Sequence, residues 1–198
     1  MQPNPASNPS RSPILIFKRW FDPGTKRNRA ISDVLYERIV AAARQTAIYA
    51  SWDVPDTPLG RFEMVGLHVF LFLHRVRGES APISEIAQTL TDEFFTDVDS
   101  SLRELGIGDA GVPKRVKKLA KMFYGRVNSY SDALDRADED ALAKALTRNV
   151  RPDVTDWEGG APLAAYVFEA VRMLAEQRSE LLLAGEIMFP DAGRMVDR

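Results

Sequence analysis

The feature that most constrains the fold of this chain is the spacing of its apolar residues, which recur every three to four positions along much of the sequence. The clearest case is the segment 59–77. One apolar series in this segment consists of Phe62, Val65, Val69, Phe72 and Val76. A second series, which fills the remaining sides of the helix, consists of Met64, Leu67 and Leu71. Together they nearly encircle a helix, which is typical of a helix buried on all sides. We therefore predict that this segment is the central helix of the fold.

Boundary signals divide the rest of the chain into further helices of the same period. Ser32 is a plausible cap before the first, Thr57-Pro58 opens the second, and Gly106 ends the third. The predicted helices are 33–50, 59–77, 82–105, 113–135, 138–147 and 161–183. No segment alternates as a strand does, so the sequence predicts an all-α protein, a compact bundle of about six helices. Residues 31–198 are expected to form this helical domain, and residues 1–30 a basic N-terminal segment that is disordered or arm-like.

Composition restricts the cellular location of the chain and the kinds of site it can contain. The sequence has 198 residues, which suits one domain, and contains no cysteine, which excludes disulfides, thiolate metal sites and cysteine nucleophiles. The most apolar stretch is interrupted by His68 and closely flanked by charges, so it falls short of the roughly 20 apolar residues of a membrane span. The N-terminus lacks the apolar core of a secretory signal. We expect a cytoplasmic protein, with the mitochondrial matrix as the alternative.

No pattern in the sequence predicts catalysis, a metal site or a cofactor. Residues 106–111 match G-x-G-x-x-G, but a helix precedes them where a dinucleotide site needs a strand, so we interpret them as a connector between helices. His68 and His74 lie six residues apart on one helix, which directs them to different sides and favours packed or edge histidines over a shared ligand set. The chain is predicted not to be an enzyme and to have no small-molecule substrate.

A basic segment is the strongest local signal in the sequence. Lys114, Lys117, Lys118 and Lys121 follow the helical period and form one stripe of the predicted helix 113–135. With Arg115 and Arg126 they make the predicted partner-binding site. Opposite the stripe lie Val116, Leu119, Ala120, Phe123, Val127 and Tyr130, which must pack on the core. The stripe either pairs with the acidic face of helix 82–105, or is simply solvated, or contacts an acidic partner such as RNA, anionic lipid or an acidic protein.

The N-terminal segment carries a second candidate contact site, for a membrane or a client protein. Apolar and aromatic residues stand beside two cations there, in the group Ile14, Phe17, Lys18, Arg19, Trp20 and Phe21. This composition is typical of a weak interfacial anchor. An ordered arm packed against the domain is the equal alternative.

An extended stretch of the chain resembles a known family. Residues 94–109, and then 112–118 and 120–126, closely resemble the ubiquinol–cytochrome c chaperone family. Upstream, Leu35-Tyr36 with Tyr49, and the run from Arg61 to Val69, look like the opening helices of the same family. The similarity is best over residues 32–133. It is far more specific than any short motif described above.

The resemblance implies a function as well as a fold. Members are all-helical assembly chaperones that bind newly made cytochrome b and support its assembly into the cytochrome bc1 complex, respiratory complex III. Mitochondrial members act with a small partner protein, and fungal ones engage the ribosome. This chain looks like the bacterial form, so the expected location is the cytoplasm, peripherally at the inner membrane. A nucleic-acid- or ribosome-binding helical module acting through the basic fourth helix is the alternative function.

Overall fold

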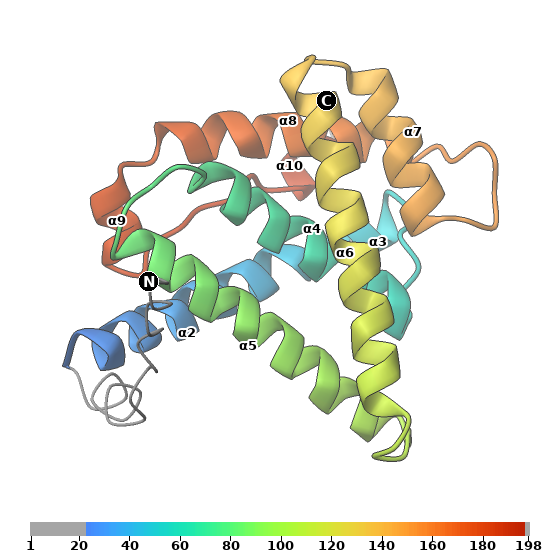
Figure 1. Cartoon of the computed structure of the whole chain (residues 1–198). Helices are drawn as coiled ribbons and strands as arrows, with labels where there is room; N and C mark the ends of the chain where they lie inside the picture. The colour runs from blue at the N-terminus through green and yellow to red at the C-terminus, as the bar shows by residue number, and fades with distance from the viewer. Residues whose placement is uncertain (1–22, 197–198) are drawn as a thin grey trace, which may run out of the picture.

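The computed structural model describes residues 23–196, and within them every regular element is a helix, which confirms the all-α prediction. In chain order the helices are α2 (Pro23–Ala43), α3 (Thr46–Ala50), α4 (Pro58–Arg75), α5 (Ile83–Glu104), α6 (Val112–Asp135), α7 (Glu139–Val150), α8 (Gly160–Glu176), α9 (Ser179–Leu183) and α10 (Gly193–Val196). Figure 1 shows α4 near the middle, with α8 above it, α2 and α5 below it, and α6 upright beside it. No helix within residues 23–196 combines the length and apolarity needed to cross a membrane.

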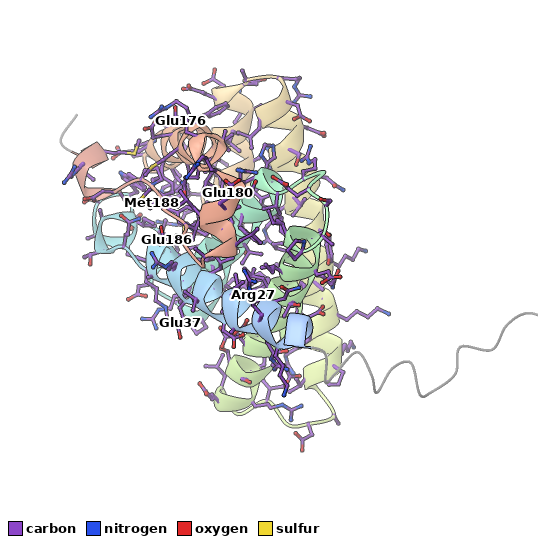
Figure 2. All side chains as sticks on the ribbon, turned by 90° about the vertical axis from the view of Figure 1, so that its left-hand side faces the viewer. Arg27, Glu37, Glu176, Glu180, Glu186 and Met188 are labelled. Carbon is purple, nitrogen blue, oxygen red and sulfur yellow. The ribbon has the colours of Figure 1, made fainter. Side chains whose placement is uncertain are left out.

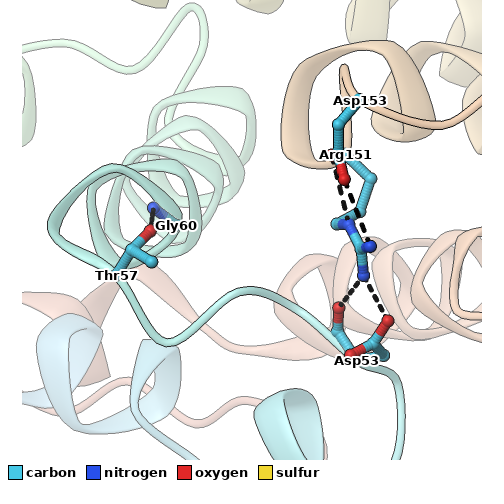
Figure 3. Close-up of polar contacts among 5 residues, drawn as sticks. All are labelled: Asp53, Thr57, Gly60, Arg151 and Asp153. Carbon is cyan, nitrogen blue, oxygen red and sulfur yellow. Dashed lines mark hydrogen bonds and ion pairs between the residues drawn. The ribbon is translucent and has the colours of Figure 1, made fainter.

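Helix α4 is the core of the bundle, as its apolar pattern predicts. Its residues from Glu63 to Phe72 are all buried. The predicted start is also confirmed, because the side chain of Thr57 accepts a hydrogen bond of 3.1 Å from the backbone N–H of Gly60 and Pro58 occupies the first turn (Figure 3). A side chain at position 60 would meet the carbonyl oxygen of Pro55 at 1.9 Å, so glycine is required where the loop folds back on the helix.

The loop before α4 is tied to the loop after α7 by one arginine. The guanidinium of Arg151 donates to the backbone carbonyl of Asp53 at 3.1 Å and pairs with the Asp53 carboxylate, while its other nitrogens reach Asp153 at 3.3 Å (Figure 3). These contacts join segments 98 residues apart in sequence. They position the first turn of α4 relative to the C-terminal helices.

The predicted helix 33–50 differs from the structure at both ends. Helix α2 already begins at Pro23, because proline is well tolerated in a first helical turn, so residues 23–30 are helical and Ser32 is an interior buried residue. The helix ends at Ala43, and Gln45 leaves the helical conformation before α3. The Gln45 amide accepts from the backbone N–H of Ala192 at 2.7 Å and donates to the carbonyl of Pro190 at 3.0 Å.

The predicted helix 161–183 is interrupted in the same way. Gln177 separates α8 from α9 with an extended backbone. Its buried amide exchanges two hydrogen bonds with the backbone of Met188, at 2.8 and 2.9 Å. Two glutamines therefore break two predicted helices by binding the same C-terminal segment, residues 188–192.

Helices α5 and α6 form a hairpin that extends beyond the rest of the bundle at the lower right of Figure 1. The connector between them is the glycine-containing segment 106–111, where Gly106 has a φ of +78° and α6 starts directly afterwards. This confirms that the G-x-G-x-x-G match is a turn between helices. Aromatic packing of Phe94 and Phe95 on Phe123 joins the two helices of the hairpin.

Candidate partner-binding surface

The first half of α6 presents the cations that the sequence stripe predicts. Lys114, Lys117, Lys118 and Lys121 are all exposed, and Arg115 is exposed beside them. We call these five residues the basic face. The opposite side of α6 packs inward, since Phe123 and Tyr130 are buried and Val116, Leu119, Ala120 and Val127 are partly buried.

The basic face has no ion-pair partner inside the described part of the chain. No carboxylate among residues 23–196 pairs with any of its five cations. One acid of the neighbouring α5 is engaged elsewhere, because Arg103 pairs with Asp99 at 2.6 Å, and Arg103 also pairs with Asp109 of the connector. Among residues 23–196 the stripe thus makes no ion pair with the acidic face of α5, and the solvated and partner-binding interpretations stay predictions.

This arrangement is electrostatically unfavourable for the protein alone. Lysines three or four residues apart on a helix repel each other, by roughly 0.2–0.5 kcal/mol per pair. The N-terminal end of a helix is also its positive end, yet the first turn of α6 carries no acid. The capping residue is Gly111, which has no side chain to cap the helix. A cluster of like charges without internal compensation is typical of a surface whose counter-charge comes from another molecule.

Arg126 does not belong to the basic face, which corrects its grouping with the other cations. Its side chain is 12% exposed, and its Nη2 lies 2.6 Å from Oε1 of Glu63, whose side chain is 2% exposed. Burial raises the pKa of Glu63 to about 7, and the charge of Arg126 acts in the opposite direction. This ion pair fastens the middle of α6 to α4 and is structural.

An apolar groove lies between α4, α5 and α6, on the inward side of α6, where Leu119 lines it. Its volume is about 510 Å³. The apolar lining comes from Leu59, Phe62, Val65, Phe94, Val98, Leu102, Leu105 and Leu119, and Arg44, Arg61, Asp97 and Glu104 stand among these residues. Leu59 and Leu105 are 47% and 57% exposed. Sequence analysis missed this groove, although exposed leucines at a helix start and a helix end are its signal.

The two histidines are packed residues, as predicted. His68 is fully buried, lies 2.8 Å from the hydroxyl of Tyr166 and 2.8 Å from the carbonyl of Met64, and its pKa is lowered by burial to about 4. His74 is half-buried, and burial lowers its pKa as well. Within residues 23–196 no group of three or more histidine or carboxylate side chains is placed to hold a metal ion.

The second candidate site falls outside the described residues. Ile14, Phe17, Lys18, Arg19, Trp20 and Phe21 all precede residue 23, where the described part of the structure begins. Their role as an interfacial anchor or an ordered arm stays a prediction.

Comparisons with known proteins agree on one family. The model of a family described as ubiquinol-cytochrome C chaperone matches residues 50–189. The ubiquinol-cytochrome-c reductase complex assembly factor 1 of Xenopus laevis is 26% identical over 138 residues, covering 69% of this chain and 68% of the frog protein. The protein of the same name from Drosophila melanogaster is 24% identical over 167 residues, covering 81% of this chain but only 64% of the fly protein.

A solved structure is closer in sequence. The crystal structure of the Cbp3 homolog from Brucella abortus is 54% identical to this chain, with a TM-score of 0.80, and the match covers 91% of this chain and 98% of that one. The matched family region, residues 50–189, includes both the basic face and the greater part of the apolar groove.

Proposed function

The chain belongs to the ubiquinol-cytochrome C chaperone family, and on that premise we propose that it is an assembly factor for ubiquinol–cytochrome c reductase, respiratory complex III. The family resemblance in the sequence is thereby confirmed. The family match over residues 50–189 is the observation that carries the proposal. The frog and fly relatives, whose names state this assembly role, are matched over 68% and 64% of their lengths.

We further propose that the client is newly made cytochrome b and that the protein acts by binding, without catalysis. The apolar groove supports this proposal, because an exposed apolar channel can bind an apolar segment of a client protein that is not yet packed against its neighbours in the complex. The basic face supports a second contact, with an anionic partner. A cytoplasmic location at the inner membrane, the mitochondrial matrix as the alternative, and a small partner protein all stay predictions.

A deletion strain tests the proposed function. Loss of the protein should lower the haem absorbance of the bc1 complex and antimycin-sensitive activity, while oxidases that take electrons directly from quinol remain active. Normal complex III in the deletion strain would contradict the proposal. If the purified protein then bound RNA with steep salt dependence, the alternative function as a nucleic-acid module would be supported.

Complementation of the same strain tests the groove. We expect that a Leu59→Asp, Leu105→Asp variant fails to restore complex III, because two charges enter the apolar channel at exposed positions that tolerate them in the fold. The double variant Met188→Asp, Val196→Asp is the matched control, since these residues are 54% and 42% exposed and do not line the groove. Equal complementation by the groove variant and the control would remove the groove from the client site.

A further inference from the structure

The basic face of α6 lies on the part of the molecule that projects furthest from the bundle. The lysines occupy the beginning of α6, at the free end of the α5–α6 hairpin (Figure 1). On the opposite side of the molecule, Figure 2 shows a face of mixed charge around α2 and α9, where Arg27 lies with the acids Glu37, Glu180 and Glu186. The concentration of like charge at the hairpin therefore has no counterpart on that side of the molecule.

Apolar side chains accompany the cations at both ends of the basic face. At the start of α6, Cγ2 of Ile107 and Nη1 of Arg115 lie within 3.3 and 3.0 Å of the point where a Cβ on Gly111 would be, so the two side chains are neighbours. At the other end, Tyr124 is 53% exposed and lies one turn beyond Lys121, on the same side as Lys117. A tyrosine with one apolar and one polar end is suited to the boundary between lipid and water.

We infer that the basic face holds the protein on the surface of an anionic bilayer, with Ile107 and Tyr124 as the apolar contacts at its two ends. This inference deepens the proposed function, on which it rests for its biological purpose, because complex III is assembled in a membrane. The protein would then approach the bilayer with the free end of its α5–α6 hairpin.

The composition of the face favours lipid over nucleic acid. Four of its five cations are lysines, whose compact charge suits many anionic headgroups, whereas bidentate contacts with individual phosphates favour arginine. The single arginine, Arg115, lies near Ile107 at the start of α6. An exposed helix side with apolar residues at its ends matches the interfacial mode of membrane binding.

Vesicle binding by the purified full chain tests the inference. The probe is sedimentation with vesicles of phosphatidylcholine and phosphatidylglycerol, compared with phosphatidylcholine alone, at low and high salt. Replacement of Lys114, Lys117, Lys118 and Lys121 by glutamine should lower the partition coefficient by on the order of 600-fold at low salt, since each of the four lysines near an anionic bilayer contributes about fivefold. The effect should shrink at high salt.

A matched control separates position from net charge. Glutamine at Arg38, Arg136, Lys144 and Arg178 removes the same number of charges from exposed positions outside the basic face, and should leave vesicle binding close to that of the unmodified chain. Tyr124→Ser should weaken binding at low and high salt alike, because an apolar contact is not screened. Both quadruple variants are checked for unfolding by urea, so that loss of binding is not loss of fold.

Three outcomes would overturn the inference. One is equal binding to neutral and anionic vesicles, and another is a reduction of less than about threefold in the lysine variant. The third is unchanged vesicle binding with loss of RNA binding, which would assign the face to nucleic acid. None of these outcomes contradicts the proposed assembly function as long as the deletion strain lacks complex III. Failure of the membrane inference can therefore be distinguished from failure of the proposed function.

Discussion

The first half of α6 carries five exposed cations without an internal partner, whereas its middle carries Arg126, buried against Glu63. The two regions belong to one helix and to one run of basic residues in the sequence. Charge in the first region contributes nothing to packing and is available to another molecule. Charge in the second region is enclosed, and its removal affects the fold. The same residue type therefore serves association in one place and stability in the other.

The largest expected effect comes from leaving Arg126 buried without its partner. Glu63→Met should lower the free energy of unfolding by about 3–5 kcal/mol, because the guanidinium of Arg126 stays charged in the core and loses its oxygen partner. Urea unfolding measures the loss. The double variant Glu63→Met, Arg126→Met removes both charges and should recover most of the stability. A loss below about 1 kcal/mol in the single variant would mean that the pair is not enclosed as the structure has it.

The complementary change, Arg126→Met, should make stability depend more steeply on pH. Burial raises the pKa of Glu63 to about 7, above its ordinary value of 4.5, so between these values the folded protein binds more protons than the unfolded chain. Stability from this group is fully present below about pH 4.5 and is lost as pH rises through about 7. Without Arg126 the folded pKa should rise further, and the loss should extend to higher pH.

This pH effect is measured by urea unfolding from pH 5 to 8. Its slope cannot exceed about 1.4 kcal/mol per pH unit for one proton. Glu63→Gln is the control, because it lacks the titrating group while His68 and His74 still titrate. Parallel profiles for Arg126→Met and Glu63→Gln would contradict the assignment of the slope to Glu63.

A smaller loss is expected at the C-terminal half of α6. Tyr130→Phe removes the hydroxyl that accepts a hydrogen bond of 3.1 Å from Asn149 of α7, and should lower stability by about 1 kcal/mol. Tyr124→Phe is the matched control on the same helix, and its exposed hydroxyl should be removable without measurable change. Equal effects of the two changes would erase the contrast between the two regions.

The smallest effect on stability is expected at the basic face. Replacement of its four lysines by glutamine should change the free energy of unfolding by less than about 1 kcal/mol, with a gain at low salt as mutual repulsion and the unfavourable interaction with the helix dipole disappear. The gain should vanish at high salt. A clear loss of stability at low salt would show that the lysines have internal partners after all.

The sequence by itself determined the features that depend on neighbouring residues. The apolar period of α4, its start at Thr57 and Pro58, and the turn at Gly106 follow from local geometry and are confirmed. The outward position of the lysines follows from the same period. The family resemblance over residues 94–126 also needs only the order of residues.

Only the tertiary structure decided the features that depend on distant contacts. The helices break at Gln45 and Gln177 because their amides bind backbone groups of residues 188–192, which lie up to 147 positions away. Arg126 is buried because Glu63 of another helix faces it, and the groove exists because three helices leave a channel between them. Helical periodicity tells which side of a helix is apolar, but it carries no information about which other helix will cover that side, and the packing of the whole chain supplies that choice.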